Sequence, residues 1–105
     1  MSEFVELSDA DFKQTITTQK LAIVDYFASW CGACRMAAPM FKRVATELNM
    51  SLYKIDAEKN PDSRDGVSVE NLPTVALVKD GKIVGSITTA REEALKEFLK
   101  QHGVG

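Results

Sequence analysis

The two cysteines of the chain, Cys31 and Cys34, lie where a strand-like segment meets a helix-like segment. Residues 21–28 are almost entirely apolar, with β-branched and aromatic side chains, which is typical of a buried strand. From residue 36 to residue 48, apolar residues recur at the spacing of an amphipathic helix. This pattern favours an α/β fold with the cysteine pair at a helix N-terminus.

The spacing of the cysteines suits a reversible disulfide. Residues three apart on one helical turn have Cβ atoms about 5–6 Å apart, and a disulfide needs about 3.8 Å, so a small adjustment closes the bond. The partial positive charge of a helix N-terminus stabilises a thiolate, and Arg35 lies one turn further on. We therefore expect a lowered thiol pKa for Cys31, with Cys34 the more shielded of the two.

Other roles for the cysteine pair fit the sequence less well. A structural zinc site and an iron–sulfur cluster usually need four ligands, whereas the chain offers two cysteines and one distant histidine. A structural disulfide across so short a loop would contribute little through chain entropy. We expect neither a metal nor a bound cofactor.

Composition limits the remaining possibilities. A chain of 105 residues, 45% hydrophobic and 27% charged, is expected to form a single domain over residues 1–105. A net charge of -2, with scattered Lys and Arg, argues against nucleic-acid binding. Because residues 1–6 lack the parts of a signal peptide and no apolar run reaches membrane-spanning length, we expect a cytoplasmic monomer without membrane contact.

Local patterns place the other elements. We expect strands at 3–6, 21–28, 51–56, 74–79 and 82–87, with Asp80-Gly81 as a two-residue hairpin turn. Helices are expected from Ser8 to about residue 18, after the cysteines with a kink at Pro39, within the polar segment 57–71, and from a Thr89 cap to Gly103. The order β-α-β-α-β-α-β-β-α predicts a central mixed sheet flanked by helices on both faces, with the second strand central.

Asp25 and Met36 lie in segments that are expected to be buried. Asp25 interrupts a buried strand, so its carboxyl must be protonated, paired with a cation or exposed to a solvated cavity, unless backbone donors at a strand end satisfy it. We expect desolvation to raise its pKa. Met36 is assigned, with Met40, to the buried stripe of the helix.

The segment Trp30-Cys31-Gly32-Ala33-Cys34 resembles the W-C-G-P-C signature of the thioredoxin family, and a C-x-x-C beside a strand–helix–strand pattern is typical of that family. Further residues in family order are Asp25, Pro39, Lys54, Leu72-Pro73-Thr74 and Lys79-Asp80-Gly81. The resemblance covers essentially the whole chain and implies a thioredoxin-like fold.

The resemblance also implies an activity, protein-disulfide reduction. Cys31 would be the nucleophile and Cys34 the resolving cysteine, while Asp25 would exchange a proton with Cys34, assisted by Lys54. The implied partners are disulfide-containing proteins and a thioredoxin reductase that draws on NADPH, with no cofactor bound by the chain itself.

The implied docking surface consists of five residues: Trp30, Gly32, Ala33, Leu72 and Pro73. In this family the proline is cis, although X–Pro bonds are cis only about 5–6% of the time in folded proteins. A cis bond would leave the backbone of Leu72 free to pair with an extended partner segment.

The chain departs from the family pattern near this surface. Ala33 replaces a proline, which predicts a midpoint potential somewhat less reducing than that of W-C-G-P-C members but still in the reductase range. Phe27 stands where a tryptophan is common. Because fold does not fix function, an interaction or chaperone module with incidental redox activity remains the alternative.

Overall fold

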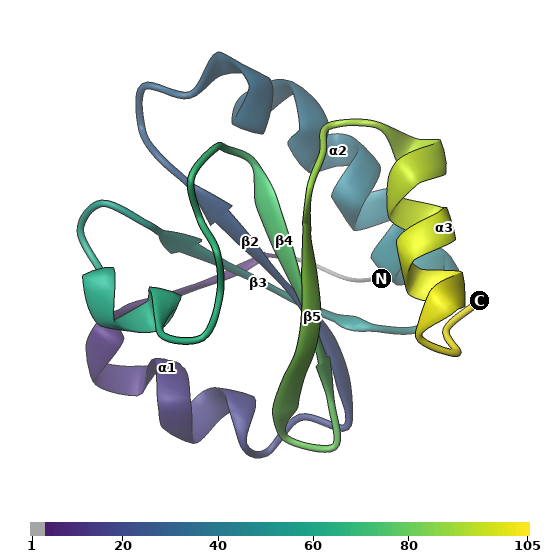
Figure 1. Ribbon diagram of the computed structural model, residues 1–105, viewed down its shortest axis with the longest axis horizontal. Helices are drawn as coiled ribbons and strands as arrows, with labels where there is room; N and C mark the ends of the chain where they lie inside the picture. The colour runs from purple at the N-terminus through teal and green to yellow at the C-terminus, as the bar shows by residue number, and fades with distance from the viewer. Residues whose placement is uncertain (1–3) are drawn as a thin grey trace.

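The computed structural model describes residues 4–105. Within that range it contains five strands, three α-helices and one short 3₁₀ helix. In chain order the elements are β1 (Val5–Leu7), α1 (Asp9–Ile16), β2 (Leu21–Phe27), α2 (Gly32–Glu47), β3 (Ser51–Asp56), η1 (Pro61–Arg64), β4 (Thr74–Lys79), β5 (Lys82–Thr88) and α3 (Glu92–Gln101). Figure 1 shows the sheet between α1 and η1 on one side and α2 and α3 on the other.

The sheet is mixed, and β2 is its central strand. The strand order is β1-β3-β2-β4-β5. β3 pairs in parallel with both β1 and β2, whereas β4 runs antiparallel to β2 and β5. The predicted α/β architecture and the central place of the second strand are confirmed. The carboxyl end of β2 therefore leads into α2 at the middle of the sheet.

Each face of the sheet has its own apolar core. One core joins the sheet to α2 and α3, and includes Ile23 of β2 with Phe41 and Leu99. The other joins it to α1, and includes Val24 and Tyr26 of β2. Because successive side chains of a strand point to opposite faces, Asp25 lies on the α2 side, the same side as Ile23.

The beginning of the chain differs from expectation in its boundaries. β1 covers residues 5–7 rather than 3–6, and Glu3 lies outside the described residues. Ser8 is the N-cap of α1 as predicted, and its backbone N–H donates to the Asp11 carboxylate at 2.7 Å. The helix ends at Ile16, two residues earlier than expected, because the threonines that follow are weak helix formers.

Met36 is a correction to the predicted core. Its side chain is 85% exposed, while Met40 is buried. The buried stripe of α2 is centred on Ala37, Phe41 and Val44, and Met36 precedes it by one residue, a rotation of about 100° on a helix. The helix also continues through Pro39 from Gly32 to Glu47, so a break at the proline is excluded.

The second half of the chain requires two further corrections. The polar segment 57–71 forms only the short 3₁₀ helix η1. The N-cap of α3 is Arg91 rather than Thr89, although the Thr89 hydroxyl accepts the backbone N–H of Arg91 at 3.0 Å. The hairpin is as predicted: Asp80 and Gly81 have φ values of 51° and 79°, as a two-residue turn between β4 and β5 requires.

Candidate active site

The cysteine pair lies at the start of α2, joined as a disulfide. Cys31 is the N-cap residue and Cys34 belongs to the first turn, with 5.3 Å between their Cα atoms. The backbone N–H of Cys34 donates to Sγ of Cys31 at 3.1 Å. An N–H donor and the helix N-terminus both favour negative charge on Cys31 Sγ when the bond is open.

The two cysteines do not differ in exposure, contrary to expectation. Each is 4% exposed in the disulfide form, since both pack in a small cluster with Ala28, against Phe27 and Leu72. Their surroundings differ instead. Cys34 lines a cavity of about 220 Å³ that also contains Asp25 and Lys54, whereas Cys31 is outside that lining. The cavity therefore brings Cys34, and not Cys31, together with Asp25 and Lys54.

Asp25 is the buried carboxyl of this cavity. It is 3% exposed, and its Oδ1 atom has no hydrogen-bond partner among the residues that the structure describes. Desolvation raises the pKa of Asp25 from an ordinary 3.8 to about 7, and the positive charge of Lys54 opposes this rise. The predicted direction is confirmed. A carboxyl with a pKa near neutrality can both accept and release a proton at physiological pH.

Lys54 reaches the cavity from the neighbouring strand. It is directly opposite Asp25 in the parallel pairing of β2 with β3. Its Nζ atom lies 5.5 Å from the ring centroid of Phe27 and 5.7 Å from that of Phe4. Phe4 also lines the cavity, a placement that no sequence pattern indicated because the residue lies 50 positions from Lys54.

The residues of the predicted docking surface lie around the disulfide. The Leu72–Pro73 peptide bond is cis, and Leu72 packs against the cysteine cluster. Gly32 and Ala33 are exposed in the first turn of α2, and Trp30 is 65% exposed. Pro73 itself is buried, so the exposed part of the predicted surface consists of Trp30, Gly32 and Ala33. An exposed apolar surface beside a disulfide is suited to contact with another protein.

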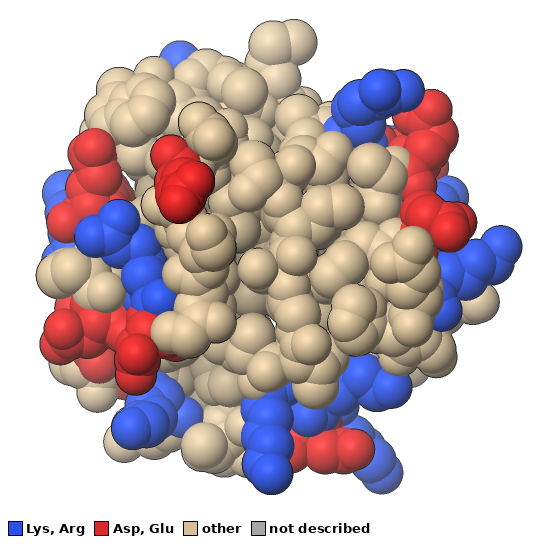
Figure 2. All heavy atoms as spheres, viewed as in Figure 1, with Lys and Arg blue, Asp and Glu red and all other residues tan. Residues whose placement is uncertain are grey.

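The side chain of Arg35 is directed toward the same turn. Its Nη1 atom donates to the carbonyl oxygen of Ser29 at 3.0 Å, and its Nη2 atom would lie 3.8 Å from a Cβ placed on Gly32. In Figure 2, charged side chains gather mainly at the sides and lower end of the molecule, the middle of the face over β5 is largely uncharged, and one acidic group lies over the segment before β4. Arg35 is thus a positive group in the same turn as the disulfide.

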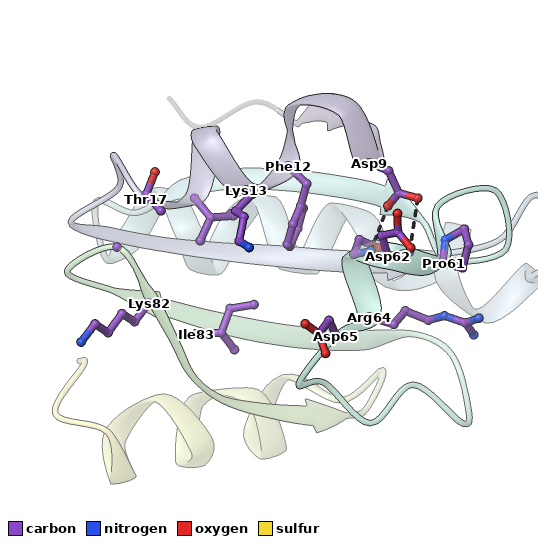
Figure 3. A pocket seen from close by; sticks show the side chains of 13 residues that line it. Asp9, Phe12, Lys13, Thr17, Pro61, Asp62, Arg64, Asp65, Lys82 and Ile83 are labelled. Atoms are coloured by element: carbon purple, nitrogen blue, oxygen red, sulfur yellow. Dashed lines mark hydrogen bonds between the residues drawn. The ribbon is translucent and has the colours of Figure 1, made fainter.

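A larger groove of about 960 Å³ lies away from the cysteines, between α1, η1 and the start of β5. Phe12 and Ile83 contribute apolar side chains to it, as Figure 3 shows. The carboxylate of Asp9 accepts the backbone N–H groups of Asp62 at 3.2 Å and Ser63 at 2.9 Å, so it ties α1 to η1. Asp9 therefore has a structural role, and the predicted site residues Asp25, Cys34 and Lys54 line the smaller cavity instead.

In the part of the chain from residue 4 onward, neither a metal-holding group of side chains nor a membrane-spanning helix is found. This part contains no group of three or more His, Cys, Asp or Glu side chains arranged to hold a metal ion. None of its helices combines the length and apolar character needed to cross a bilayer.

The mixed sheet, the C-x-x-C disulfide at a helix N-terminus and the buried acid behind it define a thiol–disulfide redox protein. Comparison with known proteins agrees. The thioredoxin family profile matches residues 3–101, and a thioredoxin from Listeria monocytogenes is 34% identical over 100 residues, which cover 92% of this chain and 96% of the relative. The chain belongs to the thioredoxin family, and its fold is the thioredoxin fold.

Solved structures show the same likeness. A Plasmodium falciparum thioredoxin superposes with a TM-score of 0.80 and 29% identity, over 95% of this chain and 98% of that one. The oxidised form of mitochondrial thioredoxin 3 from Saccharomyces cerevisiae gives a TM-score of 0.82 and 28% identity, over 93% and 94% of the two chains. The protein is thus a redox-active disulfide protein of a family that acts in cell redox homeostasis.

Proposed function

We propose that the chain is a protein-disulfide reductase. The thiolate of Cys31 attacks one sulfur of a partner's disulfide, so that a mixed disulfide forms and the partner's other sulfur leaves as a thiolate. Cys34 then loses its proton to Asp25 through water and attacks Sγ of Cys31. The partner's second sulfur leaves, and the chain's own disulfide forms. The partner gains two electrons and, from Asp25 and solvent, two protons.

One observation carries this proposal: the disulfide closes across the first turn of α2 with Asp25 in the cavity behind Cys34. The helix N-terminus and the N–H of Cys34 favour the thiolate of Cys31 as the attacking group. The raised pKa of Asp25 makes it a proton acceptor suited to neutral pH, and Lys54 tunes that pKa. Similar proteins carry the name thioredoxin.

Partner binding is assigned to the apolar surface around the disulfide. Trp30, Gly32 and Ala33 supply exposed contacts, and Leu72, which precedes the cis Pro73, supplies backbone groups for an extended segment of the partner. A thioredoxin reductase that draws on NADPH would return the chain to its dithiol form, with no cofactor held by the chain. We propose that the chain is a single-domain monomer in the cytoplasm. Because one similar solved protein is mitochondrial, cell fractionation is the direct test of the location.

The assignment of the two cysteines is tested by trapping. A Cys34→Ser variant cannot resolve the mixed disulfide and should accumulate covalent complexes with partner proteins, whereas Cys31→Ser should not. Reduction of insulin disulfides, driven by dithiothreitol, should be fast for the unmodified chain and absent for both variants. Equal trapping by the two variants would contradict the assignment.

The exposed apolar residues Trp30 and Met36 also suit a protein-binding module whose redox activity is incidental. A chain with both cysteines changed to serine separates the two functions. A reductase loses its cellular role in this variant, whereas a binding module keeps it.

A further inference from the structure

The ammonium group of Lys54 lies beside aromatic side chains, although a buried carboxyl is its neighbour on the next strand. Its Nζ atom lies near two aromatic rings, 5.5 Å from the ring centroid of Phe27 and 5.7 Å from that of Phe4. Asp25 is its register partner on β2, yet Oδ1 of Asp25 accepts no hydrogen bond from Lys54 or from any other described residue. The two rings therefore lie beside a charge that has no hydrogen bond to this carboxyl oxygen.

Phe4 is brought to this place by the edge of the sheet. It directly precedes β1, whose residue Glu6 pairs with Lys54 of β3. Its ring is half-buried against the core formed with α2 and α3, and it lines the cavity that contains Asp25. The ring is thus part of the packed structure and can act as a fixed contact for a lysine side chain, which is otherwise flexible.

An aromatic face attracts an ammonium group because the ring quadrupole is negative above the ring plane. Two rings within 6 Å of one nitrogen favour a single location for it more strongly than one ring does. A lysine held in this way supplies a positive charge to the cavity without forming a direct bond that would keep Asp25 ionised.

We propose that Phe4, together with Phe27, is a positioning residue that holds the Lys54 ammonium beside the cavity and so fixes the charge that Asp25 experiences when it exchanges a proton with Cys34. Phe4 is not among the side chains packed against the cysteine cluster and acts through Lys54. The catalytic consequence rests on the proposed reductase function, while the effect on the Asp25 carboxyl does not.

Other charged groups near the cavity come from α2. Arg35 lines it, with a guanidinium nitrogen bonded to the carbonyl oxygen of Ser29. Lys42 also lies over the Phe4 ring, with Nζ 5.7 Å from the centroid. Cys34 titrates only in the dithiol form. In the oxidised protein, Asp25 is therefore the one acidic group among the lining residues of the cavity, and its titration reports the position of Lys54.

The test follows the Asp25 carboxyl carbon by ¹³C NMR as a function of pH in the oxidised protein. Phe4→Leu keeps an apolar side chain of similar bulk but removes the ring face. With less positive charge held nearby, the pKa of Asp25 should rise above its value in the unmodified protein, because the charge of Lys54 lowers this pKa. Phe4→Tyr, which keeps the ring, should leave this pKa unchanged.

Two controls separate Lys54 from general packing. Phe12→Leu removes another half-buried ring, on the opposite face of the sheet, and should not change the Asp25 titration. In a Lys54→Met background, Phe4→Leu should have no further effect. An unchanged or lowered pKa in Phe4→Leu, or the same upward shift in the Lys54→Met background, would overturn the proposal.

This readout is independent of turnover. A chain that shows the shift but does not reduce insulin would keep the role of Phe4 and refute the reductase function. A chain that reduces insulin without the shift would refute the role of Phe4 alone. If both hold, Phe4→Leu should also move the pH profile of insulin reduction upward by the shift measured for the Asp25 carboxyl.

Discussion

The buried carboxyl of Asp25 makes a quantitative prediction about stability. Its pKa is raised from 3.8 to about 7 by burial. A folded state that binds a proton more tightly than the unfolded state is most favoured below the unfolded pKa and loses stability as the pH rises toward the folded pKa. A shift of roughly three units, at about 1.36 kcal/mol each, corresponds to a loss of ~4 kcal/mol that is complete above pH ~8.

Replacing this residue with asparagine should remove that pH dependence. The amide stays neutral, so Asp25→Asn should exceed the wild type in free energy of unfolding by only about 0.6 kcal/mol at pH 4. It should exceed the wild type increasingly through pH 5–7, by up to ~4 kcal/mol at pH 8.5. All other titrating groups are common to the two proteins, so their contributions cancel in the difference.

The measurement is urea unfolding of both oxidised proteins at pH 4, 6 and 8.5. Asp56→Asn is a matched control, because Asp56 is 5% exposed but its Oδ1 accepts the backbone N–H groups of Glu58 and Lys59. This variant should bring no gain at any of these pH values. A gain for Asp25→Asn that is independent of pH, or below about 1 kcal/mol at pH 8.5, would refute the reasoning.

Three further predictions concern single positions. Gly66 and Gly81 both have positive φ, but only a Cβ on Gly81 would meet a backbone oxygen, at 2.7 Å. Gly66→Ala should therefore lower the free energy of unfolding in urea by about 1 kcal/mol and Gly81→Ala by clearly more, and equal losses would contradict this prediction. Met36→Ala should change stability by less than about 0.5 kcal/mol, whereas Met40→Ala should cost ~2–5 kcal/mol, and the reverse order would contradict their burial. Ala33→Pro should lower the midpoint potential measured by equilibration with glutathione; an unchanged or higher value would remove this residue from the account.

Features that depend on local sequence were predicted well. The run at 21–28 is the central strand β2, shorter by one residue, because a strand that is apolar on both faces is buried by a layer on each side of the sheet. The Asp80–Gly81 turn forms because glycine accepts positive φ without a Cβ clash. The cysteines lie at the N-terminus of α2 because the strand signal ends and the helix signal begins beside them.

Features that depend on three-dimensional packing were predicted less well. Periodicity fixes a helical stripe only to within a residue, so Met36 was assigned to the wrong side. Position along a helix does not give exposure: Cys31 and Cys34 are equally buried, in a cluster against which Leu72, far away in sequence, is packed. The contact of Phe4 with Lys54 joins two strands through β1–β3 pairing, which no local pattern contains.

The central claim is that Cys31 of the reduced protein is an activated thiolate. The most direct test is the rate of alkylation of Cys31 by iodoacetamide as a function of pH, in a Cys34→Ser variant so that one thiol reacts. We predict a titration with a midpoint clearly below the ordinary thiol pKa of about 8.5, and rapid reaction at pH 7. A midpoint at or above about 8.5, with slow alkylation at neutral pH, would contradict the account.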